Sequence, residues 1–253
     1  MDWPALEPDG VLMKPFRNVY IYFALLIPAA VLAFAKTFFA GVTISGKPLT
    51  DLLRIHTALM VLWLLMLIAQ AWFIRTKRFR LHRWVGRSSY MIAPLIVLLG
   101  LATLHEVLNR TPGGVPSEGP EGARLGVFGF GQMLAFGIAW GLAIVNRKDT
   151  PRHVRFIVST TFAIAPAIVL RILPSWVPGF DTENAAVAGN CFVLTFLLLV
   201  LIAADWRMGV KRSPFWVVTI LISVMHLGYW TFAKTDGWLV FCQWFADLPS
   251  WLG

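Results

Sequence analysis

The chain has 253 residues, of which 58% are hydrophobic, with 19 Phe, 12 Trp and a mean hydropathy of +0.70. These values lie far outside the range of soluble domains and point to a membrane protein. The 22 Lys and Arg exceed the 13 Asp and Glu by nine, but they gather in short loops between apolar runs. Membrane topology explains that distribution better than nucleic-acid binding does.

Seven apolar runs follow one another, each long enough to cross a bilayer as a helix. They cover residues 16–39, 51–74, 88–109, 125–146, 154–176, 186–205 and 214–235. The first twelve residues are polar and acidic and lack the pattern of a signal peptide. The sequence therefore predicts an all-α polytopic membrane helix bundle, inserted whole as a single domain over residues 1–253.

The charged loops predict how the chain is threaded. Residues 75–87, 147–155 and 207–212 are rich in Lys and Arg, so these loops are expected on the cytoplasmic side. The N-terminus is then cytoplasmic and the C-terminus outside. The tail, residues 236–253, is rich in Trp and Phe and predicts an aromatic helix lying in the outer interface.

Strongly polar residues interrupt six of the apolar runs. Counted along the predicted helices at ~1.5 Å per residue, all fall in the outer third of the membrane. They are His56, His105, Gln132, Arg171, Asn190 and His226. One such residue commonly bonds a neighbouring helix or reaches to the interface. Six at one depth indicate a site inside the bundle.

A second group lies at the cytoplasmic ends of the third and fifth runs. It consists of His82, Arg83, Arg87, His153 and Arg155. Basic residues at such positions satisfy the positive-inside rule and contact anionic lipid. The alternative is an inner site for haem or an anionic headgroup, with the arginines pairing carboxylates or phosphates.

Several of these residues form a recognisable pattern. His56 and Gln70 precede the motif Leu81-His-Arg-Trp-Val-Gly-Arg87, and a fifth helix begins His153-Val-Arg-Phe and carries a distal Leu-Arg171. The pattern resembles a bacterial family of predicted membrane proteins known as domain of unknown function 2306, over roughly residues 56–174. The resemblance implies a multi-pass protein of the bacterial inner membrane in which these residues matter, and it implies no activity.

The leading hypothesis is that the chain binds haem b and transfers electrons within the membrane. The axial ligands of the haem would come from His56, His105 and His226. Histidines on facing helices hold haem in helix bundles, and Arg171 would pair a propionate. His82 and His105 are twenty-three residues apart in the sequence. That spacing is roughly 35 Å along a helix, too far for two stacked haems ligated from one helix. One outer haem is therefore expected.

Two further hypotheses use the same polar layer. In the first, His56, His105 and His226 bind zinc or copper, with Glu106 or water completing the shell. In the second, the protein has no redox role. It is then an accessory or assembly subunit of a larger respiratory or photosynthetic complex, or it binds a small anion or quinone headgroup through Arg171.

The remaining chemistry is sparse. Cys191 and Cys242 both fall on the outer side and could pair, although a membrane-embedded cysteine is more often a small apolar filler. The sequence contains no CxxCH, HExxH, GxSxG or phosphate-loop motif. Soluble catalytic machinery is not expected.

Overall fold

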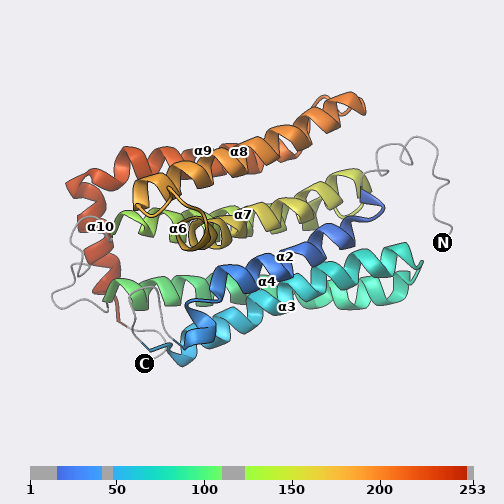
Figure 1. Ribbon diagram of the computed structural model, residues 1–253. Helices are drawn as coiled ribbons and strands as arrows, with labels where there is room; N and C mark the ends of the chain where they lie inside the picture. The colour runs from blue at the N-terminus through green and yellow to red at the C-terminus, as the bar shows by residue number, and fades with distance from the viewer. Residues whose placement is uncertain (1–15, 42–47, 110–122, 250–253) are drawn as a thin grey trace.

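The computed structural model describes residues 16–41, 48–109 and 123–249, and its regular elements are helices (Figure 1). In chain order they are α2 (Val19–Phe34), η2 (Phe38–Ala40), α3 (Asp51–Arg75), α4 (Phe79–Asn109), α6 (Gly126–Val145), α7 (Thr150–Trp176), α8 (Glu183–Arg207), α9 (Phe215–Trp230), η3 (Phe232–Lys234) and α10 (Asp236–Ala246). The predicted span 16–39 lies within these residues, whereas residues 250–253 of the predicted tail, with Trp251, lie outside them.

Six helical segments are long and apolar enough to cross a membrane: α3, α4, α6, α7, α8 and the unit formed by α9 and η3. These six confirm the prediction of a multi-pass helical protein. α2 has only 16 residues, whereas a spanning helix needs about 20. The seventh crossing and the cytoplasmic position of the N-terminus therefore stay predictions.

The helices form two bundles that share a pair of helices. α2, α3, α4, α6 and α7 contact one another in that order, and α2 also contacts α7, which closes a five-helix ring. α6 and α7 pack in addition against α8 and α9, forming a four-helix bundle. In Figure 1, α8 and α9 lie above α6 and α7, and α2, α3 and α4 lie below them.

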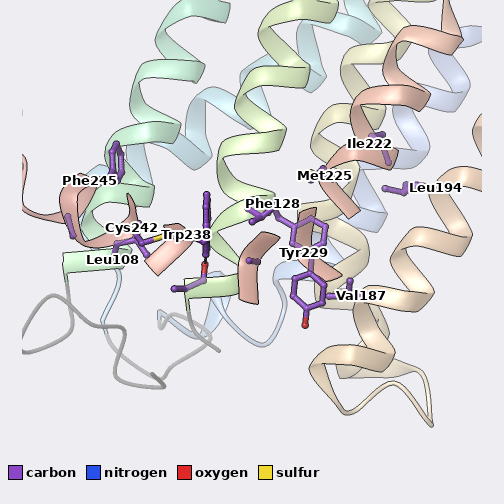
Figure 2. Close-up of a cluster of buried hydrophobic side chains, with 14 of the residues drawn as sticks. Leu108, Phe128, Val187, Leu194, Ile222, Met225, Tyr229, Trp238, Cys242 and Phe245 are labelled. Atoms are coloured by element: carbon purple, nitrogen blue, oxygen red, sulfur yellow. Dashed lines mark hydrogen bonds between the residues drawn. The ribbon is translucent and has the colours of Figure 1, made fainter. Parts of the chain in front are cut away.

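Each bundle has its own apolar core. The core of the five-helix ring includes Trp63, Ile96 and Phe136, none of which is exposed. The core of the four-helix bundle includes Leu194 and Tyr229 and continues to α10 (Figure 2). Most of the predicted site residues belong to four helices of this ring, α3, α4, α6 and α7.

The two ends of the molecule differ. Successive helices run in alternating directions, so the connections 76–78, 146–149 and 208–214, all rich in Lys and Arg, lie at one end, here called the basic end (Figure 1). The opposite end carries α10 and is here called the α10 end. The clustering of positive charge at one end agrees with the predicted topology.

A buried ion pair ties the four-helix bundle together at the basic end. Arg155 of α7 donates from Nε to both carboxylate oxygens of Asp205 in α8, at 2.9 Å each, and from Nη2 to Oδ1 at 2.7 Å. Ser213, just before α9, donates to Oδ2 of the same carboxylate at 2.6 Å. Arg155 is thus paired with a carboxylate of the protein itself, and this pairing gives no support to its predicted role at an inner haem or lipid-headgroup site.

α10 lies across the α10 end and covers it (Figure 1). Trp238, Cys242, Phe245 and Ala246 are buried, a spacing that places all four on one helix face. The Trp238 indole N–H donates to the Ala123 carbonyl at 2.8 Å. The other face, with Val240 and Trp244 exposed, is the one left for the interfacial contact that the sequence predicts.

Breaking the buried ion pair should destabilise the protein strongly. Arg155→Ala leaves Asp205 in an apolar interior without its cation, which lowers the free energy of unfolding by about 3–5 kcal/mol. Arg54→Ala removes a matched arginine from an exposed pair with Asp51, where the Arg54 side chain is 56% exposed. That loss should stay below about 1 kcal/mol. Thermal unfolding in detergent measures both, and equal shifts for the two variants would contradict the assignment.

The thiol of Cys242 should react slowly. Cys191 and Cys242 are both free thiols, and burial raises the pKa of Cys242 to about 11. At pH 8 only about a thousandth of it is then the reactive thiolate, and ionisation increases about tenfold per pH unit. In Cys191→Ala protein, maleimide labelling should accelerate from pH 8 to pH 10, whereas detergent-unfolded protein should level off nearer pH 9. Identical profiles would show that α10 does not bury this thiol.

Candidate functional site

Two packing contacts show how the depth of His56 compares with that of His226. A Cβ atom placed on Gly100 of α4 would lie 3.2 Å from His56 and closer still to the Met133 sulfur, so α3, α4 and α6 meet there. His226 packs edge-on against Phe128 of α6, with ring centroids 5.4 Å apart. Phe128 and Met133 are five residues apart, about 7.5 Å of helix rise. His56 and His226 therefore lie within about two turns of one depth.

At that depth the residues are divided between the two bundles. His226 and Asn190 lie in the four-helix bundle, 2% and 0% exposed. His226 Nδ1 lies 2.8 Å from the Ile222 carbonyl, which can only accept, so Nδ1 carries the proton. Nε2 then accepts from the Asn190 amide at 2.8 Å. Both ring nitrogens are engaged, and the pair joins α8 to α9.

His105 lies at the α10 end and contacts α10 and the residues that follow it. Its Nε2 is 2.9 Å from the Leu248 carbonyl, and the Asn109 amide lies 3.3 Å from its Nδ1. The ring also packs edge-on against Phe245 of α10. His105 therefore fastens the chain that follows α10 to the end of α4.

The three histidines do not assemble a metal site. Across the described ranges 16–41, 48–109 and 123–249, no group of three or more His, Cys, Asp or Glu side chains could hold a metal ion. Glu106, the predicted fourth ligand, accepts a hydrogen bond from Thr50 at the start of α3, at 2.7 Å. The described geometry offers nothing in favour of the zinc or copper shell.

Arg171 remains, and its surroundings are unusual. The side chain donates from Nη1 to the Ala167 carbonyl at 2.7 Å, and its guanidinium carbon lies 4.6 Å from the centre of the Phe34 ring in α2. Its Nε is buried and has no hydrogen-bond partner. No ion pair of Arg171 occurs within the part of the chain that the structure describes. This cation is held by a carbonyl and an aromatic face.

A second cation lies near the same end of α7. Lys36, just after α2, donates to the Ser175 carbonyl at 2.7 Å and lies 4.4 Å from the centre of the Trp176 ring. The Trp176 indole donates in turn to the Leu32 carbonyl at 3.1 Å. The sequence analysis missed this pairing of α2 with α7, because the two segments are about 140 residues apart.

Two predicted residues accompany Arg171 on the ring helices. His56 has a buried Nδ1 without a hydrogen-bond partner. Gln132 lies one turn from Phe136, whose ring packs on Trp63 in the ring core. His56, Gln132 and Arg171 are here called the outer cluster, after their predicted position in the membrane.

The basic end of the ring holds a second set of polar side chains, here called the inner cluster: Gln70, His82 and His153. His153 Nδ1 donates to the Ala143 carbonyl at 2.8 Å, fixing the tautomer so that Nε2 carries the lone pair in the neutral ring. His82 lies close enough to His153 and Arg83 for both to act on its charge. Both amide atoms of Gln70 and Nδ1 of His82 are buried without partners.

The remaining predicted inner residues stay at the surface. Arg83 and Arg87 are exposed at the basic end of α4. The structure thus brings the two inner histidines together, separates Arg155 from them through its pairing with Asp205, and adds Gln70. Gln70 lies against Gly86, where a Cβ atom would be 3.7 Å from the amide nitrogen.

Comparison with known proteins gives no match: no family model, curated protein or solved structure is significantly similar to the chain. The resemblance to the domain of unknown function 2306 family therefore stays a prediction from its motifs. Arguments about function rest on the geometry alone.

Proposed function

We propose that this multi-pass membrane protein binds a small acidic or quinone-type ligand inside the five-helix ring, with Arg171 as its main contact. The observation that carries the proposal is the partly buried guanidinium of Arg171, whose Nε is buried and which has no carboxylate partner among the described residues. Arg155, on the same helix, is matched by Asp205 at 2.7 Å. Within the described residues, the Arg171 guanidinium contacts the Ala167 carbonyl and the Phe34 ring and no carboxylate.

The environment of Arg171 suits such a ligand. A cation in a membrane interior interacts strongly with any anion or polarised carbonyl that replaces water beside it. Its Nε donor is buried and unused. The neighbouring Lys36 adds positive charge, and the nearby rings of Phe34 and Trp176 provide flat apolar surface. A planar headgroup with carbonyl or carboxylate oxygens matches this combination.

The remaining members of the outer cluster would act on the ligand from the other side of the ring. The imidazole of His56 can donate one hydrogen bond and accept another, and the amide of Gln132 can donate to one oxygen and accept from a hydroxyl. A quinone headgroup needs both kinds of contact when it changes between its carbonyl and hydroxyl forms.

A short-chain benzoquinone and a monocarboxylate such as benzoate are suitable probes. At a hundred times its dissociation constant a ligand stabilises the folded state by about 2.7 kcal/mol, so the thermal midpoint in detergent should rise in wild type. Arg171→Gln should lose the rise, whereas Arg171→Lys should retain part of it through charge alone. Arg124→Gln, which removes an arginine over Tyr229 in the other bundle, should retain it. Stabilisation that survives in Arg171→Gln would refute the assignment.

A second candidate is haem b, located at the inner cluster rather than at the predicted outer histidines. The observation in its favour is the His153 bond to the Ala143 carbonyl, the arrangement that leaves Nε2 free to ligate iron and orients the ring. His82 on α4 supplies a second imidazole close by. Haem, when bound, provides one-electron transfer.

An absorption spectrum tests this candidate. Purified protein supplied with haem should show a Soret band that shifts on reduction with dithionite. The band should disappear in His82→Ala and in His153→Ala and persist in His105→Ala, because His105 is bonded to Leu248. A colourless wild type, or a band lost only in the His105 variant, would exclude the inner pair as ligands.

A further inference from the structure

Unpartnered polar atoms are concentrated along one face of α3. Five of the eight buried side-chain N and O atoms without a hydrogen-bond partner, among the described residues, lie on α3 and the start of α4. They are Nδ1 of His56, Nε1 of Trp63, Nε2 and Oε1 of Gln70, and Nδ1 of His82.

The three residues of α3 are spaced seven apart, so they share one helix face. His56 faces Gly100 and Met133, Trp63 packs on Phe136 at a centroid distance of 5.0 Å, and Gln70 lies over Gly86. These neighbours belong to α4 and α6, so the face points into the five-helix ring. It extends over fourteen residues, about 21 Å, from the outer cluster to the inner cluster.

Such a row calls for a polar occupant. A polar atom in a membrane interior that lacks a partner is costly, and in native proteins it is ordinarily satisfied by ordered water. One isolated atom needs one water. A row of polar atoms that recurs about every two turns on one helix face instead forms the lining of a hydrated path.

We propose that the α3 face of the five-helix ring lines a hydrated path that carries protons between the outer and inner clusters. The path is closed at its middle by the aromatic pair Trp63 and Phe136, both 0% exposed. The indole N–H can donate but cannot accept, so Trp63 orients water without relaying a proton itself. Protons cross this level when the two rings separate.

The chemistry involves proton transfer alone. A hydronium ion at the basic end gives its proton to His82 or His153, so that an N–H bond forms as an O–H bond breaks. Water held by the amide of Gln70 receives that proton and passes it toward His56, which releases it to water at the other end. One proton enters for each that leaves, and no oxidant or reductant is needed. The path needs a ring nitrogen of His82 or His153 that can take up a proton, so it is compatible with a ligand at Arg171 and not with haem held by both inner histidines.

The test uses the full chain in phospholipid vesicles that enclose a pH-sensitive dye. A potassium gradient with valinomycin drives protons, and the initial rate of dye response is measured. Wild type should exceed protein-free vesicles. Gln70→Leu should lose that excess, because a side chain of similar size no longer holds water. Gln70→Glu should retain it, and Trp63→Ala should raise the rate by removing the closure.

Gln243→Leu is the matched control, because Gln243 is exposed on α10 and its variant should conduct like wild type. Folding is checked by the thermal midpoint in detergent, which Gln70→Leu should preserve, since it removes an unpaired buried amide. A wild-type rate equal to that of protein-free vesicles would overturn the proposal. So would an unchanged rate in correctly folded Gln70→Leu. Either result leaves binding at Arg171 unaffected, because that is measured separately in detergent.

Discussion

The pairing of α6 with α7 is the interaction on which the rest of the structure depends. Both helices belong to the five-helix ring and to the four-helix bundle, so each must present apolar side chains on two faces. The connection between them, residues 146–149, is short, and His153 bonds back to the Ala143 carbonyl across it. This contact fixes the register of α6 against α7 and, through it, the relative position of the two cores.

Charge in the interior distinguishes the two bundles. In the four-helix bundle, the buried charge of Arg155 is paired with Asp205 and His226 is bonded to Asn190, while Oδ1 of Asn190 and Nε of Arg124 have no partner. In the ring, Arg171 has no acidic partner among the described residues, and α3 presents a row of unpaired atoms. In a membrane, where water is scarce, matched groups hold helices together and unmatched groups need an occupant. The proposed ligand site and path lie in the ring, and the four-helix bundle packs against it through α6 and α7.

Much of the fold could be predicted from the sequence, because a membrane-spanning helix requires a continuous apolar run of sufficient length, and such a run can be found locally. Six spans, the basic end and an aromatic helix near the C-terminus were predicted in this way. The common depth of His56 and His226 was also accessible, since depth follows from counting residues along each helix.

The sequence could not predict which side chains are neighbours within the plane of the membrane. His226 and His56 lie at similar depths, yet His226 contacts α8 and His56 faces the ring interior, because helix packing decides which faces meet. His105 contacts α10 for the same reason. The pairing of Arg155 with Asp205 was missed for the same reason, as fifty residues separate the two. The seven-residue spacing of His56, Trp63 and Gln70 is visible in the sequence. The sequence does not distinguish Trp63 from any other core residue, because only the structure shows that its indole N–H is unpaired.

The contact of α2 with α7 also determines when the five-helix ring can close during synthesis. Synthesis delivers α2 before α3, α4 and α6, and α7 only after them, so for most of that interval α2 has α3 as its sole neighbour among the final ring contacts. The ring cannot close until α7 arrives and Trp176 and Lys36 join their two helices. Arg171 enters the membrane on that same helix, so the cation is enclosed only at the moment the ring closes.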